Sequence, residues 1–155
     1  MTPDDLVSGL GTLLGLPELQ FDDQGGLGLD LPNGLELGLR RSRDGTEILV
    51  FAVLRVLDDP ELEAPGLLRA NLLGERTAGA CLSIGEDTDG RDCLVLWRSF
   101  VVAVIDVQAF ADALARFAEA ASLWHEGEPQ AVDASDEQEP PAILPEIGAA
   151  FGLRV

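Results

Sequence analysis

Few side chains in this sequence have the types and spacing that catalysis requires. His125 is the only histidine. It falls at the end of a predicted helix, where no Ser-His-Asp or Cys-His pair has an evident partner. Two cysteines and one distant histidine do not make a zinc site. We therefore assign His125 a surface or capping role and predict no catalytic residue, no metal site and no cofactor.

Two short motifs resemble ligand-binding loops but lack essential positions. Gly26-x-Gly28 has no third glycine and opens a predicted strand instead of a helix, so it is not a dinucleotide fingerprint. The run from Asp87 to Asp92 is similar to a calcium loop. However, Arg91 stands where a ligand is needed, Gly90 comes too early, and predicted strands flank the run. We interpret it as a turn.

Cys81 and Cys93 fall on the two arms of a predicted hairpin, so a disulfide between them is geometrically conceivable. A buried free pair fits better, because nothing else in the sequence indicates export. Acids follow Met1 where a signal peptide would carry bases, and the apolar runs are too short to span a bilayer. We expect a reducing, cytoplasmic setting.

The charge balance excludes several classes of partner. The net charge is −18, with ten basic residues that are all arginine. Binding to nucleic acid needs cations arranged as a patch, and anionic membranes need the same, so we predict neither. Solubility explains the acidity better than a specific basic partner does.

The first expected element is an amphipathic helix. Thr2 can cap it, Pro3 suits its first turn, and Pro17 ends it. Its apolar positions, Leu6, Leu10, Leu13 and Leu14, share one face. This face fits ordinary core and a partly exposed binding face about equally well.

A leucine-rich hairpin and a fully apolar strand follow. Asn33-Gly34 separates two alternating runs whose leucines all fall on one face, with glycine and acid on the other. A second turn at Asp44-Gly45 leads into Ile48 to Leu54, which is apolar at every position. We therefore expect the third strand to be central and covered on both faces.

The run from Gly66 to Gly74 predicts a short helix of about two turns with leucines around most of its surface. The alternating run from Gly79 to Ile84, the turn at Asp89-Gly90 and the run from Cys93 to Trp97 predict a hairpin after it. A chain of this size has little spare core to cover such a helix. We therefore infer that a second copy of the chain covers it.

The chain closes with a long helix capped by Asp106 and ending near Trp124. Together the patterns predict an α+β fold with the order α-β-β-β-α-β-β-α, an antiparallel twisted sheet packed by helices. We expect one domain over residues 1–126, an acidic, proline-containing linker over 127–142 and an apolar segment over 143–155. Docking of that segment on its own domain is favoured slightly over a role as a ligand for something else.

The order of elements, the size and the acidity resemble the class I chaperones of bacterial type III secretion, the Tir chaperone family. The resemblance covers roughly Thr2 to Glu126 and depends on pattern, since no single motif is diagnostic. It implies a non-catalytic homodimer that holds the N-terminal region of a secreted effector in extended form, without ATP hydrolysis, and delivers it to the secretion machinery.

The resemblance also implies two sets of site residues. The family's dimer interface, built by the second helix and the following strand, maps onto Leu67, Leu68, Asn71, Leu72, Leu73, Leu82 and Ile84. The family's client-binding patches map onto Leu6, Leu10, Leu13, Leu27, Leu29, Leu35, Leu37 and Leu39. An extended client would place anchors in apolar pockets while its backbone adds to a strand edge.

Other functions are open at this point. The same surface could sequester a protein that controls secretion gene expression. A sensory or structural domain of this fold would have no secreted client, and an enzyme would require a compact pocket lined by convergent acids.

Overall fold

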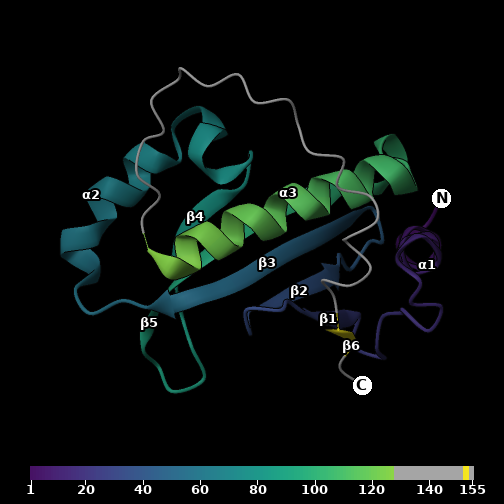
Figure 1. The fold of residues 1–155 in the computed structure, drawn as a ribbon, viewed down its shortest axis with the longest axis horizontal. Coiled ribbons are helices and arrows are strands. Elements are labelled where there is room, and N and C mark those ends of the chain that lie inside the picture. Colours follow the sequence, from purple (N-terminus) through teal and green to yellow (C-terminus); the bar gives the residue numbers. More distant parts are fainter. Residues whose placement is uncertain (128–151, 154–155) are drawn as a thin grey trace.

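The computed structural model describes residues 1–127 and 152–153 of the chain. Its elements confirm the predicted α+β fold and the predicted order (Figure 1). The helices are α1 (Pro3–Leu14), α2 (Pro60–Ala70) and α3 (Val107–Glu126), with short 3₁₀ segments η1 (Leu72–Thr77) and η2 (Val102–Val104). The strands are β1 (Gly26–Asp30), β2 (Glu36–Arg41), β3 (Glu47–Val56), β4 (Cys81–Glu86), β5 (Asp92–Val101) and β6 (Gly152–Leu153). Nearly all of the expected linker and most of the expected apolar segment lie outside the described residues.

The strands form one antiparallel sheet in the order β4-β5-β3-β2-β1-β6. The strand β3 lies between β5 and β2, so the predicted central position of Ile48 to Leu54 is confirmed. The two-residue strand β6 pairs with β1, with Leu153 opposite Leu29 and Gly152 opposite Asp30. Part of the segment 143–155 therefore lies against its own domain.

The core lies between the leucine face of the sheet and the helices α1 and α3. Figure 1 shows α3 running across the sheet, and its apolar stripe includes the buried Phe110, Leu114, Phe117 and Trp124. From the sheet, Leu37 and the alternate residues of β3 that begin at Ile48 point into the same cluster. The side chain of Asp106 caps α3 by accepting a hydrogen bond of 2.8 Å from the Ala109 N–H.

The helix α1 carries the expected cap, and its glycines allow close packing. The Thr2 hydroxyl accepts from the Asp5 N–H, and the Asp5 carboxylate accepts from the Thr2 N–H. A Cβ at Gly9 would lie 2.6 Å from Val107 of α3, and one at Gly11 would lie 2.5 Å from the Leu16 carbonyl. The glycines thus bring α1 close to α3 and to the chain that follows it.

The second helix begins earlier than the sequence pattern predicts. It starts at Pro60, where the Asp59 side chain accepts a hydrogen bond from the Leu62 N–H, and Pro65 lies inside it instead of in its first turn. The pair Asp59-Pro60 combines a capping side chain with a proline at the first helical position, which makes it the stronger start signal. The helix then ends at Ala70, and η1 replaces the predicted last turn.

The strand β5 ends at Val101, and η2 follows it. Both cysteines are free, as expected, but only Cys93 is buried and Cys81 is exposed. Cys81 lies opposite Trp97 and Cys93 opposite Gly85, so the register separates them along the hairpin.

Candidate functional site

A row of residues crosses the face of the sheet opposite to the leucines. Gly28, Gly38, Phe51 and Trp97 are successive register partners on β1, β2, β3 and β5. Trp97 is 36% exposed, and Val53 on the same face is 49% exposed. This outer face therefore presents apolar side chains to solvent in the described part of the chain.

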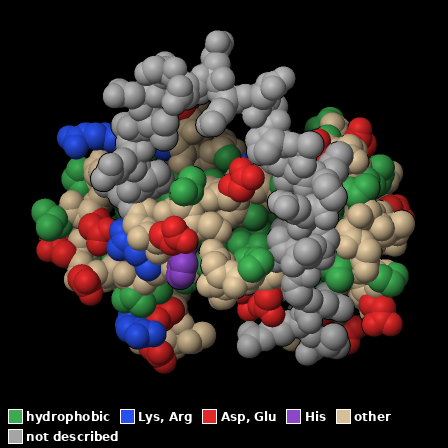
Figure 2. All heavy atoms as spheres, in the orientation of Figure 1, with side chains coloured by type: hydrophobic (Ala, Val, Ile, Leu, Met, Phe, Trp, Pro, Cys, Tyr) green, Lys and Arg blue, Asp and Glu red, His purple; other side chains and the backbone are tan. Residues whose placement is uncertain are grey.

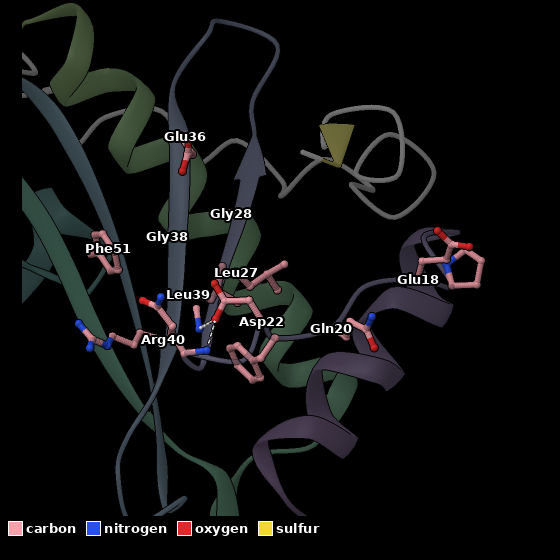
Figure 3. Close-up of a pocket in the computed structure, with 14 residues that line it drawn as sticks. Glu18, Gln20, Asp22, Leu27, Gly28, Glu36, Gly38, Leu39, Arg40 and Phe51 are labelled. Carbon is pink, nitrogen blue, oxygen red and sulfur yellow. Dashed lines mark hydrogen bonds between the residues drawn. The ribbon is translucent and has the colours of Figure 1, made fainter. Parts of the chain in front are cut away.

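One end of the outer face is hollowed into a groove of about 1060 Å³. Figure 3 shows its floor on β1, β2 and β3, and a wall formed by the segment between α1 and β1. Its lining combines glycines, aromatic rings and acids: Pro17, Glu18, Gln20, Phe21, Asp22, Gln24, Gly26, Leu27, Gly28, Glu36, Gly38, Leu39, Arg40 and Phe51.

The floor of the groove depends on glycine. A Cβ at Gly38 would lie 2.3 Å from the ring of Phe51, so the ring covers the place where a side chain would otherwise stand. A Cβ at Gly28 would lie 3.0 Å from the Glu36 carboxylate. The two glycines therefore keep this part of the floor low enough for another backbone to approach.

The wall is held against the sheet by Asp22. Its Oδ1 accepts hydrogen bonds of 2.8 Å from the N–H groups of Gln24 and Gly26, and its own N–H donates to the Gly26 carbonyl. Leu19 anchors the same segment because its side chain is buried in the core. The groove is thus built by the fold of the domain and is present without a ligand.

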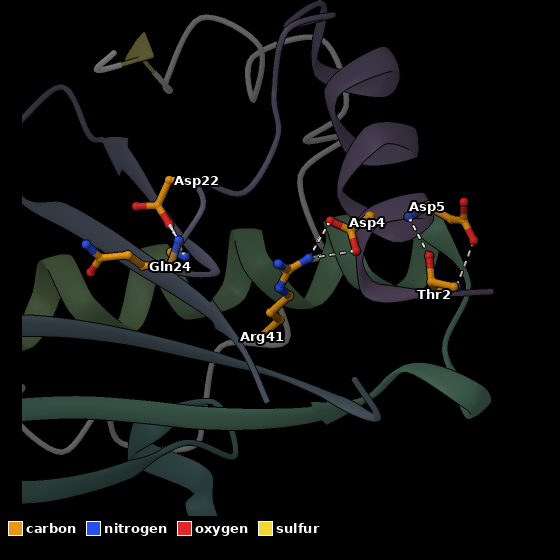
Figure 4. A network of polar contacts seen from close by, with 7 residues as sticks. Thr2, Asp4, Asp5, Asp22, Gln24 and Arg41 are labelled. Atoms are coloured by element: carbon orange, nitrogen blue, oxygen red, sulfur yellow. Dashed lines mark hydrogen bonds and ion pairs between the residues drawn. The ribbon is translucent and has the colours of Figure 1, made fainter. Parts of the chain in front are cut away.

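An arginine behind the wall ties it to α1. Arg41 Nη1 lies 3.0 Å from Asp4 Oδ1 (Figure 4). The guanidinium carbon of Arg41 lies 5.9 Å from the centre of the Phe21 ring. The ion pair is largely exposed and contributes little free energy by itself. Its geometry nevertheless places Phe21 beside the groove.

The side of β1 that faces away from β2 borders the groove, and the short strand β6 pairs with part of it. The Leu31 N–H donates to the Leu35 carbonyl, and the Arg41 N–H donates to the Gly25 carbonyl. Because antiparallel pairs alternate, the odd-numbered residues of β1 face β2. The backbone groups of Gly28 and Asp30 therefore point away from β2, toward the outer edge of the strand, where an added strand would lie.

Most of the predicted client-binding leucines lie inside the domain. The side chains of six of them are at most 4% exposed, so they pack in the core and do not form an open face: Leu6, Leu10, Leu29, Leu35, Leu37 and Leu39. Leu27 is half-buried and lines the groove, and Leu13 is 44% exposed. The expectation of an open leucine face is thus corrected, because α1 and α3 cover that face.

The sequence contained a signal for the groove that the leucine pattern hid. By sequence pattern, the second face of the first hairpin carries only glycine and acid, and Phe51 belongs to a strand expected to be covered on both faces. The structure shows that a glycine beside an aromatic residue on the next strand forms the floor of a groove there.

Two other polar residues that the sequence pattern singles out, His125 and Asp87, lie at a helix end and in a turn. His125 Nδ1 contacts the Leu54 carbonyl at the end of α3. Asp87 Oδ1 accepts from the N–H groups of Asp89 and Arg91, which makes a tight turn between β4 and β5. Within residues 1–127 and 152–153, no group of three or more His, Cys, Asp or Glu side chains could hold a metal ion, and no helix is long and apolar enough to cross a membrane.

The fold is shared with chains from several solved complexes. One is in the crystal structure of the ExsC–ExsE complex, at 21% identity and a TM-score of 0.64, covering 85% of this chain and 100% of that one. Another is in the HopA1–SchA chaperone–effector complex. It has 22% identity and a TM-score of 0.64, and the match covers 79% of this chain and 92% of that one. A third is in the heterodimeric ExoU–SpcU complex from the type III secretion system of Pseudomonas aeruginosa. It has 25% identity and a TM-score of 0.53, and the match covers 80% of this chain and 92% of that one. No curated protein matches the sequence significantly.

The sequence profile of the Tir chaperone protein (CesT) family matches residues 5–125. This match spans α1 to the last turn of α3 and so includes the whole described domain except its ends. The chain belongs to the Tir chaperone family. The matched region contains the groove, the outer edge of β1 and the second helix.

The structure separates the interface residues that Tir chaperone membership implies into two groups. Leu67 and Leu82 are buried within the chain itself. The Asn71 amide bonds both backbone groups of Leu82, with Oδ1 2.7 Å from its N and Nδ2 2.9 Å from its O. These three residues join α2 to β4 inside one chain.

The other predicted interface residues form an exposed apolar cluster, which we call the α2 cluster. It comprises Leu62, Leu68, Leu72, Leu73 and Ile84, which are 77%, 72%, 72%, 83% and 41% exposed. Leu62 is added by the structure. Figure 2 shows hydrophobic side chains projecting at the margin of the molecule where Figure 1 places α2.

Proposed function

We propose that this chain is a non-catalytic, ATP-independent chaperone that binds the N-terminal region of a type III secreted effector in extended form. Membership of the Tir chaperone family is the observation that carries the proposal. The related folds include chains from complexes named as chaperone and effector. The client keeps its competence for secretion because it is held without a fold of its own.

The groove and the edge of β1 supply the chemistry for such a client. The backbone groups of Gly28 and Asp30 point to this edge, where β6 pairs with Asp30, and an extended chain can take the place of β6 as the added strand. The side chains of a strand alternate, so one set would face the groove and its Phe51 ring. Three acids, Glu18, Asp22 and Glu36, line the groove against one arginine, Arg40, so a client with basic residues near the acids fits best.

The α2 cluster supports a homodimer. Large exposed apolar side chains on α2, η1 and the following strand β4 indicate an interaction site. Leu73 is also held at φ 60°, in the left-handed region that costs a branched residue about 1–2 kcal/mol. A strained and exposed leucine is best explained by a contact that it makes in the assembled protein. A second copy would also double the contact along one client.

Delivery of the client to the secretion machinery from the cytoplasm completes the proposal. Figure 2 shows acidic side chains spread over the visible face and few basic ones. With a net charge of −18, the loaded complex would repel other copies and stay in solution.

The variant Gly28→Pro tests the proposed client site. Proline removes the N–H that points to the outer edge of β1, whereas the N–H groups that bond β2 belong to the neighbouring residues. We expect capture of the client from the protein's own cells, measured by co-purification, to fall at least about tenfold with proline.

The matched control is Gly28→Ala, which keeps the N–H and adds only a methyl group near the flexible Glu36 carboxylate. It should capture the client nearly as well as the natural chain. Equal capture by Gly28→Pro and Gly28→Ala, with both variants folded by circular dichroism, would refute the edge of β1 as the client site.

A further inference from the structure

The outer edge of β1 already has an occupant within the chain. Leu153 lies opposite Leu29 and Gly152 opposite Asp30 in an antiparallel pairing, and Figure 1 shows β6 beside β1. We propose that β6 is an internal competitor that occupies the client's edge until a client displaces it. This inference rests on the proposed function, in which the client adds a strand to β1.

The two occupants must overlap at Asp30. Because the odd-numbered residues of β1 bond β2, only Gly28 and Asp30 of the strand direct backbone groups outward beyond the turn held by Asp22. β6 pairs with Asp30. A client that uses the whole edge therefore cannot bind while Gly152 remains opposite Asp30.

The pairing is short enough to be displaced. β6 contains two residues, which pair with Leu29 and Asp30, whereas the outward backbone groups of Gly28 lie beyond that pairing. A client strand that bonds both Gly28 and Asp30 would form more backbone hydrogen bonds than β6 does. A covalently attached segment acts at a high effective concentration, so a weak pairing still excludes weak ligands.

The register also specifies which strands the edge accepts. Leu29 is fully buried in the core, so a residue that pairs with Leu29 stands on the core face of the sheet. In β6 the residue at that position is Leu153. In sequence, Phe151, Leu153 and Val155 alternate with Gly152 and Arg154, which is the pattern of a strand with one apolar face. The edge therefore selects extended segments that are apolar at alternate positions, and a client must match this pattern to replace β6.

A labelled peptide with the sequence of residues 143–155 serves as the probe, because it should bind the same edge in trans. Its affinity is measured by fluorescence anisotropy for the full chain and for the full-length variant Gly152→Pro. In the pairing opposite Asp30 the Gly152 N–H faces β1, so proline at that position removes an inter-strand donor. We expect the peptide to bind Gly152→Pro at least about tenfold more tightly than the natural chain.

The matched control is Leu153→Pro, in which proline stands where the N–H points away from β1. In this variant β6 should still compete with the peptide for the edge of β1. The peptide should therefore bind Leu153→Pro with about the affinity that it has for the natural chain. Amide hydrogen exchange at Asp30 gives a second readout: exchange should be faster in Gly152→Pro and slow again when the peptide is added.

Equal affinity of the peptide for the natural chain and for Gly152→Pro, or absence of binding to both, would overturn the inference. The probe is not a client, so this outcome is distinct from failure of the proposed function. That failure would appear as absence of a captured partner from the natural chain. A chain that captures a client but shows no effect of Gly152→Pro keeps the proposed function and loses only the internal competitor.

Discussion

Three aspartates have lowered pKa values, and each one holds a turn or a helix end. The pKa of Asp5 is lowered first by the Thr2 N–H, that of Asp44 by the Ser42 hydroxyl, and that of Asp87 by the Arg91 N–H. None of these residues lines the groove. The altered acidities therefore indicate stabilised loops, and they do not point to an acid or a base at the proposed client site.

Asp87 should make the stability of the chain depend on pH. Its pKa lies below the ordinary value of 3.8, so its ionised form stabilises the folded chain above that pH. This contribution is lost as the pH falls through the lowered pKa. We expect Asp87→Asn to lose less stability than the natural chain on acidification from about pH 5 to about pH 3, measured by urea denaturation.

The control for this measurement is Asp23→Asn, which removes the same charge from a turn outside the β4–β5 hairpin. If Asp23→Asn flattened the pH dependence as much as Asp87→Asn, the effect would come from net charge, and the role given to the Asp87 turn would be wrong.

At the scale of elements, the joint between α2 and β4 depends on one amide. Asn71 satisfies both backbone groups of Leu82 on the edge strand β4. Removal of the amide leaves a donor and an acceptor in a half-buried place, which costs about 1–3 kcal/mol. We expect Asn71→Ala to lower the free energy of unfolding by that amount in a urea titration.

Asn71→Asp is the matched comparison. Its carboxylate can still accept from the Leu82 N–H, but it meets the Leu82 carbonyl without a donor. It should therefore also destabilise the chain. If either variant were as stable as the natural chain, the joint between α2 and β4 would not depend on the two hydrogen bonds of the Asn71 amide.

The elements that the sequence predicts well are those with a strong period or a clear turn. The leucines around Asn33-Gly34 and the stripe from Phe110 to Trp124 each fix a face, and both faces are where the pattern places them. The start of α2 is missed because its apolar residues begin only at Leu62, after the cap. Its real start is marked by Asp59-Pro60.

The site is harder to predict than the fold because a period shows which residues share a face but not what covers that face. The leucines of β1 and β2 fit an open groove or a core equally well from sequence. Coverage by α1 and α3 decides between them, and that depends on packing between distant segments. The groove floor also requires Gly38 and Phe51 to be cross-strand neighbours, which only the register reveals.

At the scale of the whole molecule, the α2 cluster leaves large leucine side chains in solvent. We expect Leu72→Glu to raise the dissociation constant of a homodimer by at least about tenfold, because the charge would be buried without a partner at the interface. Sedimentation equilibrium measures this change. Leu72 is 72% exposed in the single chain, so the substitution should leave the fold intact.

Val104→Glu is the control, because Val104 is 84% exposed but lies on η2, outside the α2 cluster. It should not change self-association. A Leu72→Glu chain that associates like Val104→Glu would exclude the α2 cluster as the interface between two copies.

Native mass spectrometry of the chain purified from its own cells tests the central claim most directly, since one spectrum reports both the number of copies and any retained polypeptide. The proposed function predicts two copies of the chain with one heterologous polypeptide bound through its N-terminal region. The identity of that polypeptide would also distinguish a secreted effector from a protein that controls gene expression. A bare chain without any bound polypeptide, under conditions where the secretion system is expressed, would contradict the proposed function.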